Sequence, residues 1–262
     1  MSTQERVGPP SEPDFVVVLP EDGQTRNQDE EWCEVVCDGR RRRIRFHDYH
    51  DVYGIPRLYE HLIYHRLECR SPQVIAKLLD DVLAARGSDP AELRVLDVGA
   101  GNGMVGEELR KLGVDAVYGV DIIPEAAQAT HRDRPGVYDG YLTADLTNLT
   151  PDQRATLVDA DLNTMTVISA LGFDGVPPHA FAQAYNLIST PGWLAFTIKE
   201  DFLRERDSTG FAQLIQRMRD EQLILPLAHE RYRHRLSACG KPLYYFAYVA
   251  LKEWPIPEHW LT

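Results

Sequence analysis

Thirteen consecutive residues, RVLDVGAGNGMVG at positions 94–106, combine an acid with closely spaced glycines after an apolar run. Asp97 lies in this run, and Gly99, Gly101 and Gly103 follow it before an amphipathic segment. Glycine is needed where a ligand lies against the backbone between a strand and a helix, because a Cβ atom would block the approach. The spacing therefore predicts a ligand site at the carboxyl edge of a parallel sheet.

The same glycines permit two interpretations. Residues 101–106 form a GxGxxG pattern, which in a dinucleotide-binding fold holds a pyrophosphate and has a carboxylate about 20 residues later, where Asp121 stands. Asp97 before the glycines and Asp145 at the end of the third expected strand add two more acids. An edge with three carboxylates suits a ligand with hydroxyl donors or a positive charge better than a pyrophosphate.

The segments VLDVGAGNG, VYGVDI and YLTADL together resemble the class I S-adenosylmethionine-dependent methyltransferases, over about residues 72–251. The resemblance implies that Asp97, Gly99 and Gly101 surround the methionine moiety of S-adenosylmethionine. It also implies that Asp121 binds both ribose hydroxyls and that Asp145 receives the adenine amino group. Strand-end residues beside these positions complete the expected cofactor site: Ile122, Leu146 and Ser169.

Residues 167–203, from VISALGFDG to KEDFL, resemble a narrower branch that contains the Williams-Beuren-region methyltransferase-like proteins and bacterial relatives. In that branch a helix and a Pro-Gly turn likewise precede a strand that ends in a Lys- or Asn-Glu-Asp-Phe run, here residues 199–202. The present chain has a longer N-terminal extension. The branch therefore does not fix the methyl acceptor.

In this superfamily the transferable methyl group points toward the ends of the fourth and fifth strands. The expected acceptor wall consists of Ser169, Ala170, Leu171, Phe173, Lys199 and Glu200. An ion pair at a solvated strand exit is an equally good interpretation of the last two residues.

Four side chains are candidates for a general base: His61, His65, Lys199 and Glu200. The two histidines are four residues apart and would share one helix face. Surface or packing roles are their alternative. The catalytic residue stays open, because in-line methyl transfer can proceed through positioning and desolvation alone.

Tyrosines gather in the segment before the first glycine-rich strand, at positions 49, 53, 59 and 64. Helical spacing is found for Leu58, Leu62 and His65, or for Tyr59, Ile63 and Arg66. It predicts a helix from about Pro56, which would act as a lid over the sheet edge. Aromatic faces can cover a sulfonium by cation-π attraction and exclude water. Relatives carry a cofactor-contacting tyrosine in this region, and Tyr59 is its best counterpart here, with Tyr53 second.

Strand, turn and helix patterns alternate from Leu93 onward. We expect strands near 93–98, 115–120, 138–144, 162–169 and 193–199, and helices near 103–112, 124–133, 151–158 and 177–190. A helix near 208–222 precedes two long strands, about 225–236 and 243–251. The prediction is an α/β, Rossmann-like class I methyltransferase fold, with a seven-stranded, mostly parallel sheet and an antiparallel last strand.

Three regions are expected along the chain: a Pro-rich disordered tail (1–13), an N-terminal hairpin and lid (14–70) and a methyltransferase domain (71–262). In the second region, residues 31–36 and 41–46 flank an Asp-Gly turn as a hairpin. Ser71 is expected to cap the helix that follows the lid.

Composition excludes several classes of function. Lys and Arg number 28 against 40 Asp and Glu, so the net charge is −12 and nucleic acid is not an expected partner. The basic run at 40–43 is expected on the solvated side of the hairpin.

No apolar stretch reaches the ~20 residues that span a bilayer, and no signal-peptide pattern opens the chain, so we expect no membrane partner and a cytoplasmic location. The four cysteines lack a CxxC pair, which indicates reduced thiols and no metal site.

The expected activity is methyl transfer from S-adenosylmethionine to a small-molecule acceptor. An NAD(P)-dependent oxidoreductase is one alternative. A protein methyltransferase or a cofactor-binding regulator is the other, since the arginine-bearing hairpin would permit a macromolecular partner. The oligomeric state stays open.

Overall fold

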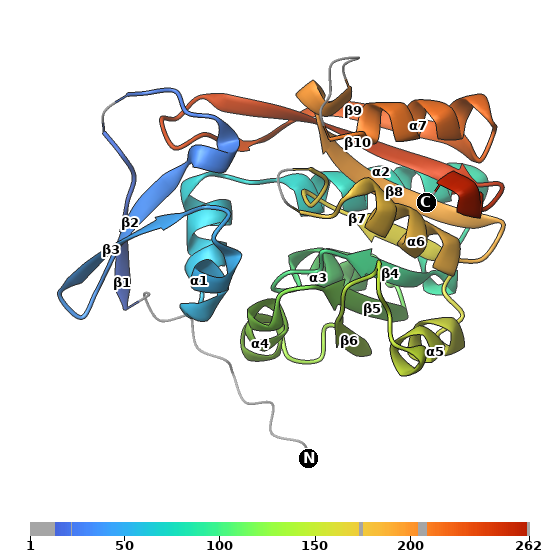
Figure 1. The fold of residues 1–262 in the computed structure, drawn as a ribbon, viewed down its shortest axis with the longest axis horizontal. Helices are drawn as coiled ribbons and strands as arrows, with labels where there is room; N and C mark the ends of the chain where they lie inside the picture. Colours follow the sequence, from blue (N-terminus) through green and yellow to red (C-terminus); the bar gives the residue numbers. More distant parts are fainter. Residues whose placement is uncertain (1–13, 22, 173–174, 204–208, 261–262) are drawn as a thin grey trace.

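The computed structural model describes residues 14–21, 23–172, 175–203 and 209–260, so the expected tail and Phe173 lie outside the described residues. The described chain forms a large seven-stranded sheet with helices on both faces and a smaller three-stranded sheet near the N-terminus (Figure 1). The strand order of the large sheet is β6-β5-β4-β7-β8-β10-β9. Its strands are β4 (Arg94–Val98), β5 (Ala116–Asp121), β6 (Gly140–Thr143), β7 (Thr164–Val167), β8 (Gly192–Lys199), β9 (Ile224–Leu236) and β10 (Pro242–Lys252).

Strands β4 to β8 pair in parallel, whereas β10 pairs antiparallel with both β8 and β9. The chain leaves β4 on one side toward β5 and returns on the other side to β7, which creates a crevice at the carboxyl ends of these strands. The expected Rossmann-like class I methyltransferase fold is confirmed.

Two layers of helices bury the faces of the large sheet. α2 (Ser71–Arg86) and α3 (Met104–Lys111) cover one face through Leu79 and Leu109. α5 (Pro151–Asp159), α6 (Pro178–Leu187) and α7 (Phe211–Asp220) cover the other through residues such as Leu157, Phe181 and Phe211. The sheet is therefore closed on both faces, and its carboxyl edge remains for a ligand.

The lid helix expected from about Pro56 is present but shorter, and a separate short helix precedes it. α1 (Tyr49–Gly54) is followed by a π-helix, η2 (Glu60–Arg66), and Arg57 between them has a positive φ of 63°. Because a left-handed residue cannot continue a right-handed helix, the chain turns there. α1 packs against α4 (Pro124–Asp133), where Tyr53 joins Ala126 and Ala129 in a small apolar cluster.

Residues 14–70, here called the N-terminal layer, have an apolar core of their own. β1 (Phe15–Val18), β2 (Trp32–Cys37) and β3 (Arg40–Arg45) form an antiparallel sheet, and the expected Asp-Gly turn joins β2 to β3. The side chains of residues 40–43 are exposed, and three of these arginines contact neighbours: Arg41 and Arg43 pair with Glu34, and Arg42 pairs with Asp51. The arginine run therefore lies on the solvated side of the hairpin, as expected.

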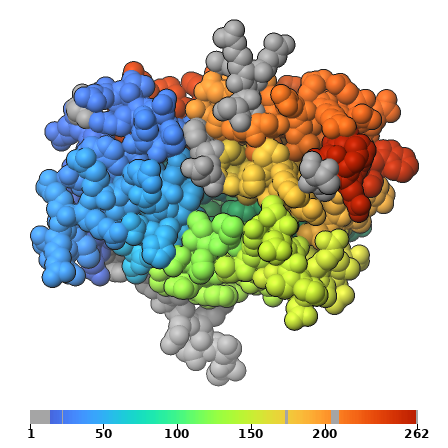
Figure 2. Space-filling view, in the orientation of Figure 1, coloured from blue at the N-terminus to red at the C-terminus, as the bar shows by residue number. Residues whose placement is uncertain are grey.

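Buried polar contacts join the N-terminal layer to β9 and to the turn that follows it. Glu31 and Arg235 form an ion pair at 2.6 Å, with 2% and 4% of their side chains exposed. The other carboxylate oxygen of Glu31 accepts the backbone N–H of Ala238 at 2.5 Å. The space-filling view shows this layer, in blue, packed against the green to orange remainder of the chain (Figure 2).

Candidate functional site

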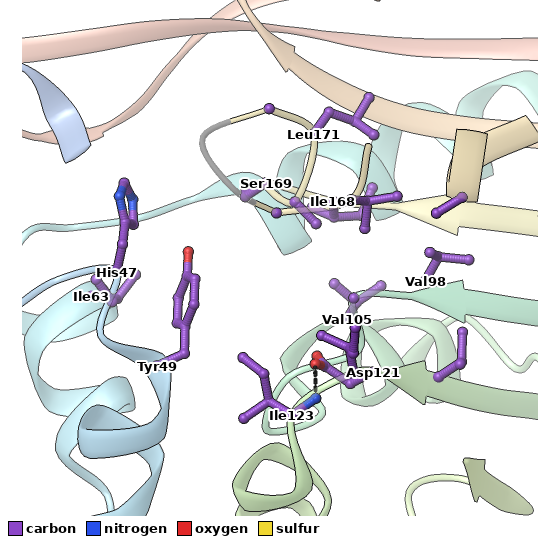
Figure 3. Close-up of a pocket in the computed structure, with 18 of the residues that line it drawn as sticks. His47, Tyr49, Ile63, Val98, Val105, Asp121, Ile123, Ile168, Ser169 and Leu171 are labelled. Carbon is purple, nitrogen blue, oxygen red and sulfur yellow. Dashed lines mark hydrogen bonds between the residues drawn. The ribbon is translucent and has the colours of Figure 1, made fainter. Parts of the chain in front are cut away.

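A cavity of about 410 Å³ lies between the carboxyl edge of the large sheet and the N-terminal layer. We call the lining residues at the ends of β4 to β7 the sheet end. We call those from the N-terminal layer, β9 and β10 the lid end. Figure 3 shows Asp121 and Ile123 of the sheet end across open space from His47 and Tyr49 of the lid end.

Asp121 ends β5 and holds a fixed position in the sheet end. One carboxylate oxygen accepts the N–H of Gly101 at 2.9 Å, and the other accepts the N–H of Ile123 at 3.0 Å (Figure 3). Burial raises the pKa of this carboxyl above its usual value. Each carboxylate oxygen has a further lone pair. The side chain can therefore accept the two hydroxyls of a ribose diol in the expected manner.

In the glycine-rich turn, neighbouring side chains lie so close to the backbone that only glycine fits at two positions. Gly99 and Gly101 have φ values of +70° and +54°, in the left-handed region. A Cβ on Gly99 would lie 2.7 Å from the Cβ of Ala170, and one on Gly101 would lie 2.5 Å from the hydroxyl oxygen of Tyr53. Gly99 lines the cavity, whereas Gly101 lies behind the Tyr53 ring and contributes its N–H to Asp121.

Asp145 and its neighbours line the far part of the sheet end. The Asp145 carboxylate accepts the backbone N–H and the hydroxyl of Thr147, at 2.8 and 2.7 Å, and these hydrogen bonds lower its pKa. Leu146 lines the same wall, and Ile122, an apolar residue, is 64% exposed. An acceptor carboxylate between apolar side chains is suited to the adenine ring and its amino group.

Ser169 lies two residues after the end of β7 in a strained conformation. Its φ is +58°, and its N–H donates to Thr197 Oγ1 at 2.8 Å. Its Oγ is buried and has no hydrogen-bond partner among the described residues. Such strain and such an unpaired hydroxyl are typical of ligand sites. Ala170 and Leu171 line the cavity beside it, as expected for the acceptor wall.

Asp97 differs from the expectation, because it is 1% exposed and does not line the cavity. Its carboxylate accepts the hydroxyls of Tyr138 at 2.6 Å and Thr166 at 2.7 Å. Burial raises its pKa to about 7, against the lowering effect of these hydrogen bonds. Asp97 therefore stabilises the end of β4 through buried hydrogen bonds and does not line the cavity.

The lid tyrosines pack against one another over the cavity. Tyr59 has its ring centre 4.8 Å from that of Tyr53 and 6.0 Å from that of Tyr64, and burial raises its pKa. Tyr49 stacks on Tyr53 at 5.9 Å. All four tyrosines line the cavity, so Tyr59 lies where the lid hypothesis requires it.

The four candidate bases do not line the cavity. His61 packs on Phe15, and His65 is 63% exposed near Glu60. Lys199 pairs with Asp201 at 3.3 Å and Glu200 with Arg231 at 2.9 Å, which are the ion pairs of a strand exit. The cavity thus supports neither the expected base role of these residues nor the wall role of Lys199 and Glu200.

Sequence analysis missed most of the lid end. Gln28, Phe46, His47, His234, Arg235 and Tyr245 all line it. They come from segments more than 200 residues apart, and Ser71, expected as a helix cap, instead hydrogen bonds to His234. The alternating charged run around His234 resembled an exposed strand, so no local signal marked this histidine as buried.

Three further observations bear on the type of site. Among the described residues, His, Cys, Asp and Glu side chains do not gather in a group that could hold a metal ion. The cysteines form no disulfide. In the described part of the chain, helices fall short of the length and apolar character that crossing a membrane requires.

Residues 70–237 match the sequence family described as "Methyltransferase domain". Ribosomal protein L11 methyltransferase of Marinobacter nauticus is 37% identical over 84 residues, which are 31% of this chain and 28% of that protein. The match thus spans less than a third of that relative's length.

Solved structures with a similar fold include a putative RNA methyltransferase from Pyrococcus horikoshii. It has a TM-score of 0.50 and 14% identity, over 71% of this chain and 86% of that chain. Magnesium protoporphyrin IX methyltransferase from Synechocystis, with bound S-adenosylmethionine, has a TM-score of 0.47 and 15% identity, over 70% of this chain and 79% of that chain. At these identities the likeness concerns the fold.

The family match includes all of the expected sheet-end positions, from Asp97 to Ser169. The narrower Williams-Beuren-region branch stays a prediction. By its family match, the chain belongs to the methyltransferase domain family, which confirms the expected class I superfamily with S-adenosylmethionine as its cofactor.

Proposed function

We propose that this protein transfers a methyl group from S-adenosylmethionine to a small-molecule acceptor. The observation that carries the proposal is the single cavity with two unlike ends. Its sheet end presents Asp121, Asp145 and the Ser169 hydroxyl, and its lid end is built mainly of aromatic rings. The cofactor would lie along the sheet end and the acceptor against the lid end.

The residues of the sheet end fit the cofactor in chemical type. Asp121 accepts hydrogen bonds from the ribose diol, Asp145 accepts one from the adenine amino group, and Ile122 and Leu146 cover the ring. Gly99 leaves room for the methionine part, and Tyr59 covers the sulfonium. S-adenosylmethionine supplies an electrophilic methyl group. The chain orients it toward the lid end and excludes water, which contributes roughly 7 to 11 kcal/mol to catalysis in well-oriented reactions.

A small acceptor is favoured over a macromolecule for two reasons. The N-terminal layer packs over the cavity and is joined to β9 by the buried Glu31–Arg235 pair, so the lid end is walled by protein. Three exposed arginines of β3, at positions 41–43, contact Glu34, Asp51 and the Trp32 ring, and the net charge is −12. Two of the proteins named above are a ribosomal protein methyltransferase and a putative RNA methyltransferase, which makes a macromolecular acceptor the second candidate.

The cytoplasm is our proposed location, because the four cysteines are unpaired.

Mass spectrometry of ligand released from the heat-denatured protein, with calorimetry on the emptied protein, tests the proposal. We expect S-adenosylmethionine or S-adenosylhomocysteine to be released and to rebind. Rebinding of NAD or NADP, with neither sulfur compound bound, would instead support the oxidoreductase.

A further inference from the structure

The lid end contains a histidine that the proposed function does not use. His234 on β9 is buried, with 5% of its surface exposed, and lines the cavity. His234 has no partner in the register of β9 and β10, because Arg233 pairs with Tyr244 and Arg235 pairs with Leu243. A β-bulge of this kind redirects a side chain and is common beside active sites. It explains why both His234 and the next residue, Arg235, are buried.

A buried network fixes the orientation of this imidazole. Nδ1 lies 2.7 Å from Ser71 Oγ, which lies 2.6 Å from the Tyr232 hydroxyl. Thr197 Oγ1 accepts the N–H of Ser169 at the sheet end. The ring face stacks on Tyr245 at 4.0 Å. Since Nδ1 and one face are engaged, the Nε2 edge is left for the cavity.

The charge balance of the lid end favours an uncharged ligand. Burial lowers the pKa of His234 well below its usual value, and the positive charges of Arg235 and His47 add to this effect, so the imidazole is neutral near pH 7. Arg235 carries a permanent charge, which Glu31 balances inside the protein at 2.6 Å. A charged ligand would lose its water here without an opposite charge to replace it.

The remaining walls favour a flat molecule with a hydrogen-bond donor. Six Phe and Tyr rings line the lid end: Phe46, Tyr49, Tyr53, Tyr59, Tyr64 and Tyr245. Gln28 Nε2 donates to the Tyr245 hydroxyl at 3.1 Å. Gln28 Oε1 is buried and has no partner among the described residues, so it can accept a hydrogen bond from a ligand.

We propose that the methyl acceptor is an uncharged aromatic compound with a ring hydroxyl, and that His234 takes the hydroxyl proton at Nε2. This inference rests on the proposed function. The hydroxyl oxygen forms the new bond to the methyl carbon with a lone pair, and the carbon–sulfur bond breaks with its electrons left on sulfur. The proton goes to Nε2. Nδ1–H donates to Ser71 throughout and stabilises the resulting imidazolium.

The binding test uses the full chain saturated with S-adenosylhomocysteine and three probes: 2-naphthol, 2-methoxynaphthalene and 2-naphthoate. Calorimetry should show binding of 2-naphthol, at least tenfold weaker binding of the ether, which lacks the donor, and weak or absent binding of the carboxylate. His234→Phe removes the accepting Nε2 and should reduce the preference for naphthol over the ether.

The turnover test follows conversion of 2-naphthol to 2-methoxynaphthalene by mass spectrometry. His234→Gln should lower kcat by about 100-fold or more, with KM changed by less than about fivefold, because a base acts in the transition state. The control is His229→Gln, an exposed histidine on the same strand, which should keep the parental kcat. Unchanged affinity for S-adenosylhomocysteine verifies that each variant is folded.

Three results would overturn the inference: no binding of 2-naphthol, preference for the ether or the carboxylate, or parental kcat in His234→Gln. If His234→Gln does not fold, the order of probe affinities in the parent chain decides the recognition claim. Failure of the parent chain to bind S-adenosylhomocysteine would overturn the proposed function itself, which separates the two failures.

Discussion

At the scale of single residues, three aspartates lie at or near the carboxyl ends of β4, β5 and β6, and each has a different environment. Asp121 is held by two backbone N–H groups and faces the cavity. Asp145 is held by Thr147 at the cavity wall. Asp97 is enclosed by Tyr138 and Thr166 behind the wall. One sheet edge therefore carries two acids that face the cavity and a third that is buried behind its wall.

Asp121→Ala should weaken the binding of S-adenosylhomocysteine by ~100-fold, on the order of 3 kcal/mol, because it removes two charge-assisted hydrogen bonds to the ribose. Isothermal titration of parent and variant measures the change. Asp115→Ala, at an exposed position just before the same strand, is the matched control and should bind as the parent does. An unchanged dissociation constant in Asp121→Ala would remove this residue from the site.

Asp97 should make the stability of the fold depend on pH. Its folded pKa is about 7, above the ordinary value of 3.8, so the folded state holds a proton that the unfolded state releases. The stability that this proton contributes is fully present below about pH 4 and is lost as pH rises toward 7 and above. Asn at this position carries no titrating proton.

Urea unfolding of the parent and of Asp97→Asn at pH values from 5 to 9 tests this prediction. The parent should lose free energy of unfolding relative to the variant as pH rises, by an amount on the order of a few kcal/mol over the whole range. Parallel pH profiles of the two proteins would show that Asp97 does not titrate in this window.

At the scale of elements, the lid is shaped by the break at Arg57 between α1 and η2. This break turns Tyr49, Tyr53, Tyr59 and Tyr64 from two helical segments toward one cavity. Substitution of Tyr59 therefore tests whether this lid covers the cofactor.

Tyr59→Ala should weaken binding of S-adenosylmethionine by an amount equivalent to about 1 to 3 kcal/mol, through loss of cation-π contact and apolar cover. Tyr59→Phe keeps the ring and should bind nearly as the parent does. Titration of the three proteins measures this. Comparable binding by Tyr59→Ala would refute the role of this tyrosine, and weak binding by Tyr59→Phe would indicate the hydroxyl instead.

Two ion pairs connect the N-terminal layer to β9. One is buried and the other is exposed, so we expect them to contribute differently to the free energy of unfolding. Glu31→Gln leaves Arg235 buried without an opposite charge, so it should lower the free energy of unfolding by about 3 to 5 kcal/mol. Glu68→Gln removes an exposed partner of Arg233, at 2.7 Å, and should cost less than about 1 kcal/mol. Urea unfolding compares them, and equal losses would contradict the difference in burial.

At the scale of the whole molecule, the cavity lies where the N-terminal layer meets the methyltransferase fold. A ligand that binds only this closed arrangement stabilises every part that encloses it. At a hundredfold excess over its dissociation constant, S-adenosylhomocysteine should add ~2.7 kcal/mol, a rise in Tm of roughly 5 to 10 °C for a chain of this length. Thermal melts check this, with NAD as the control; a rise with NAD alone would argue against the proposed cofactor.

Local sequence determined the strand–turn–helix alternation, the glycine-rich turn and the two cavity-facing aspartates, because each depends on neighbouring residues at the end of one strand. The Asp-Gly hairpin was predictable for the same reason. Local pattern also showed that Asp97 ends an apolar run, but it could not show that the Tyr138 ring covers this acid.

Only the tertiary structure decided the composition of the lid end. Gln28, Ser71 and His234 meet there although the outer two are 206 positions apart, and none of them has a neighbour in sequence that marks it as buried. The bulge at His234 changes which side chains of β9 face inward, and a shift of one residue in a strand reverses the faces of all that follow. His61 and His65 share the expected helical stretch, yet the packing of η2 directs the tyrosines to the cavity and leaves these histidines outside it.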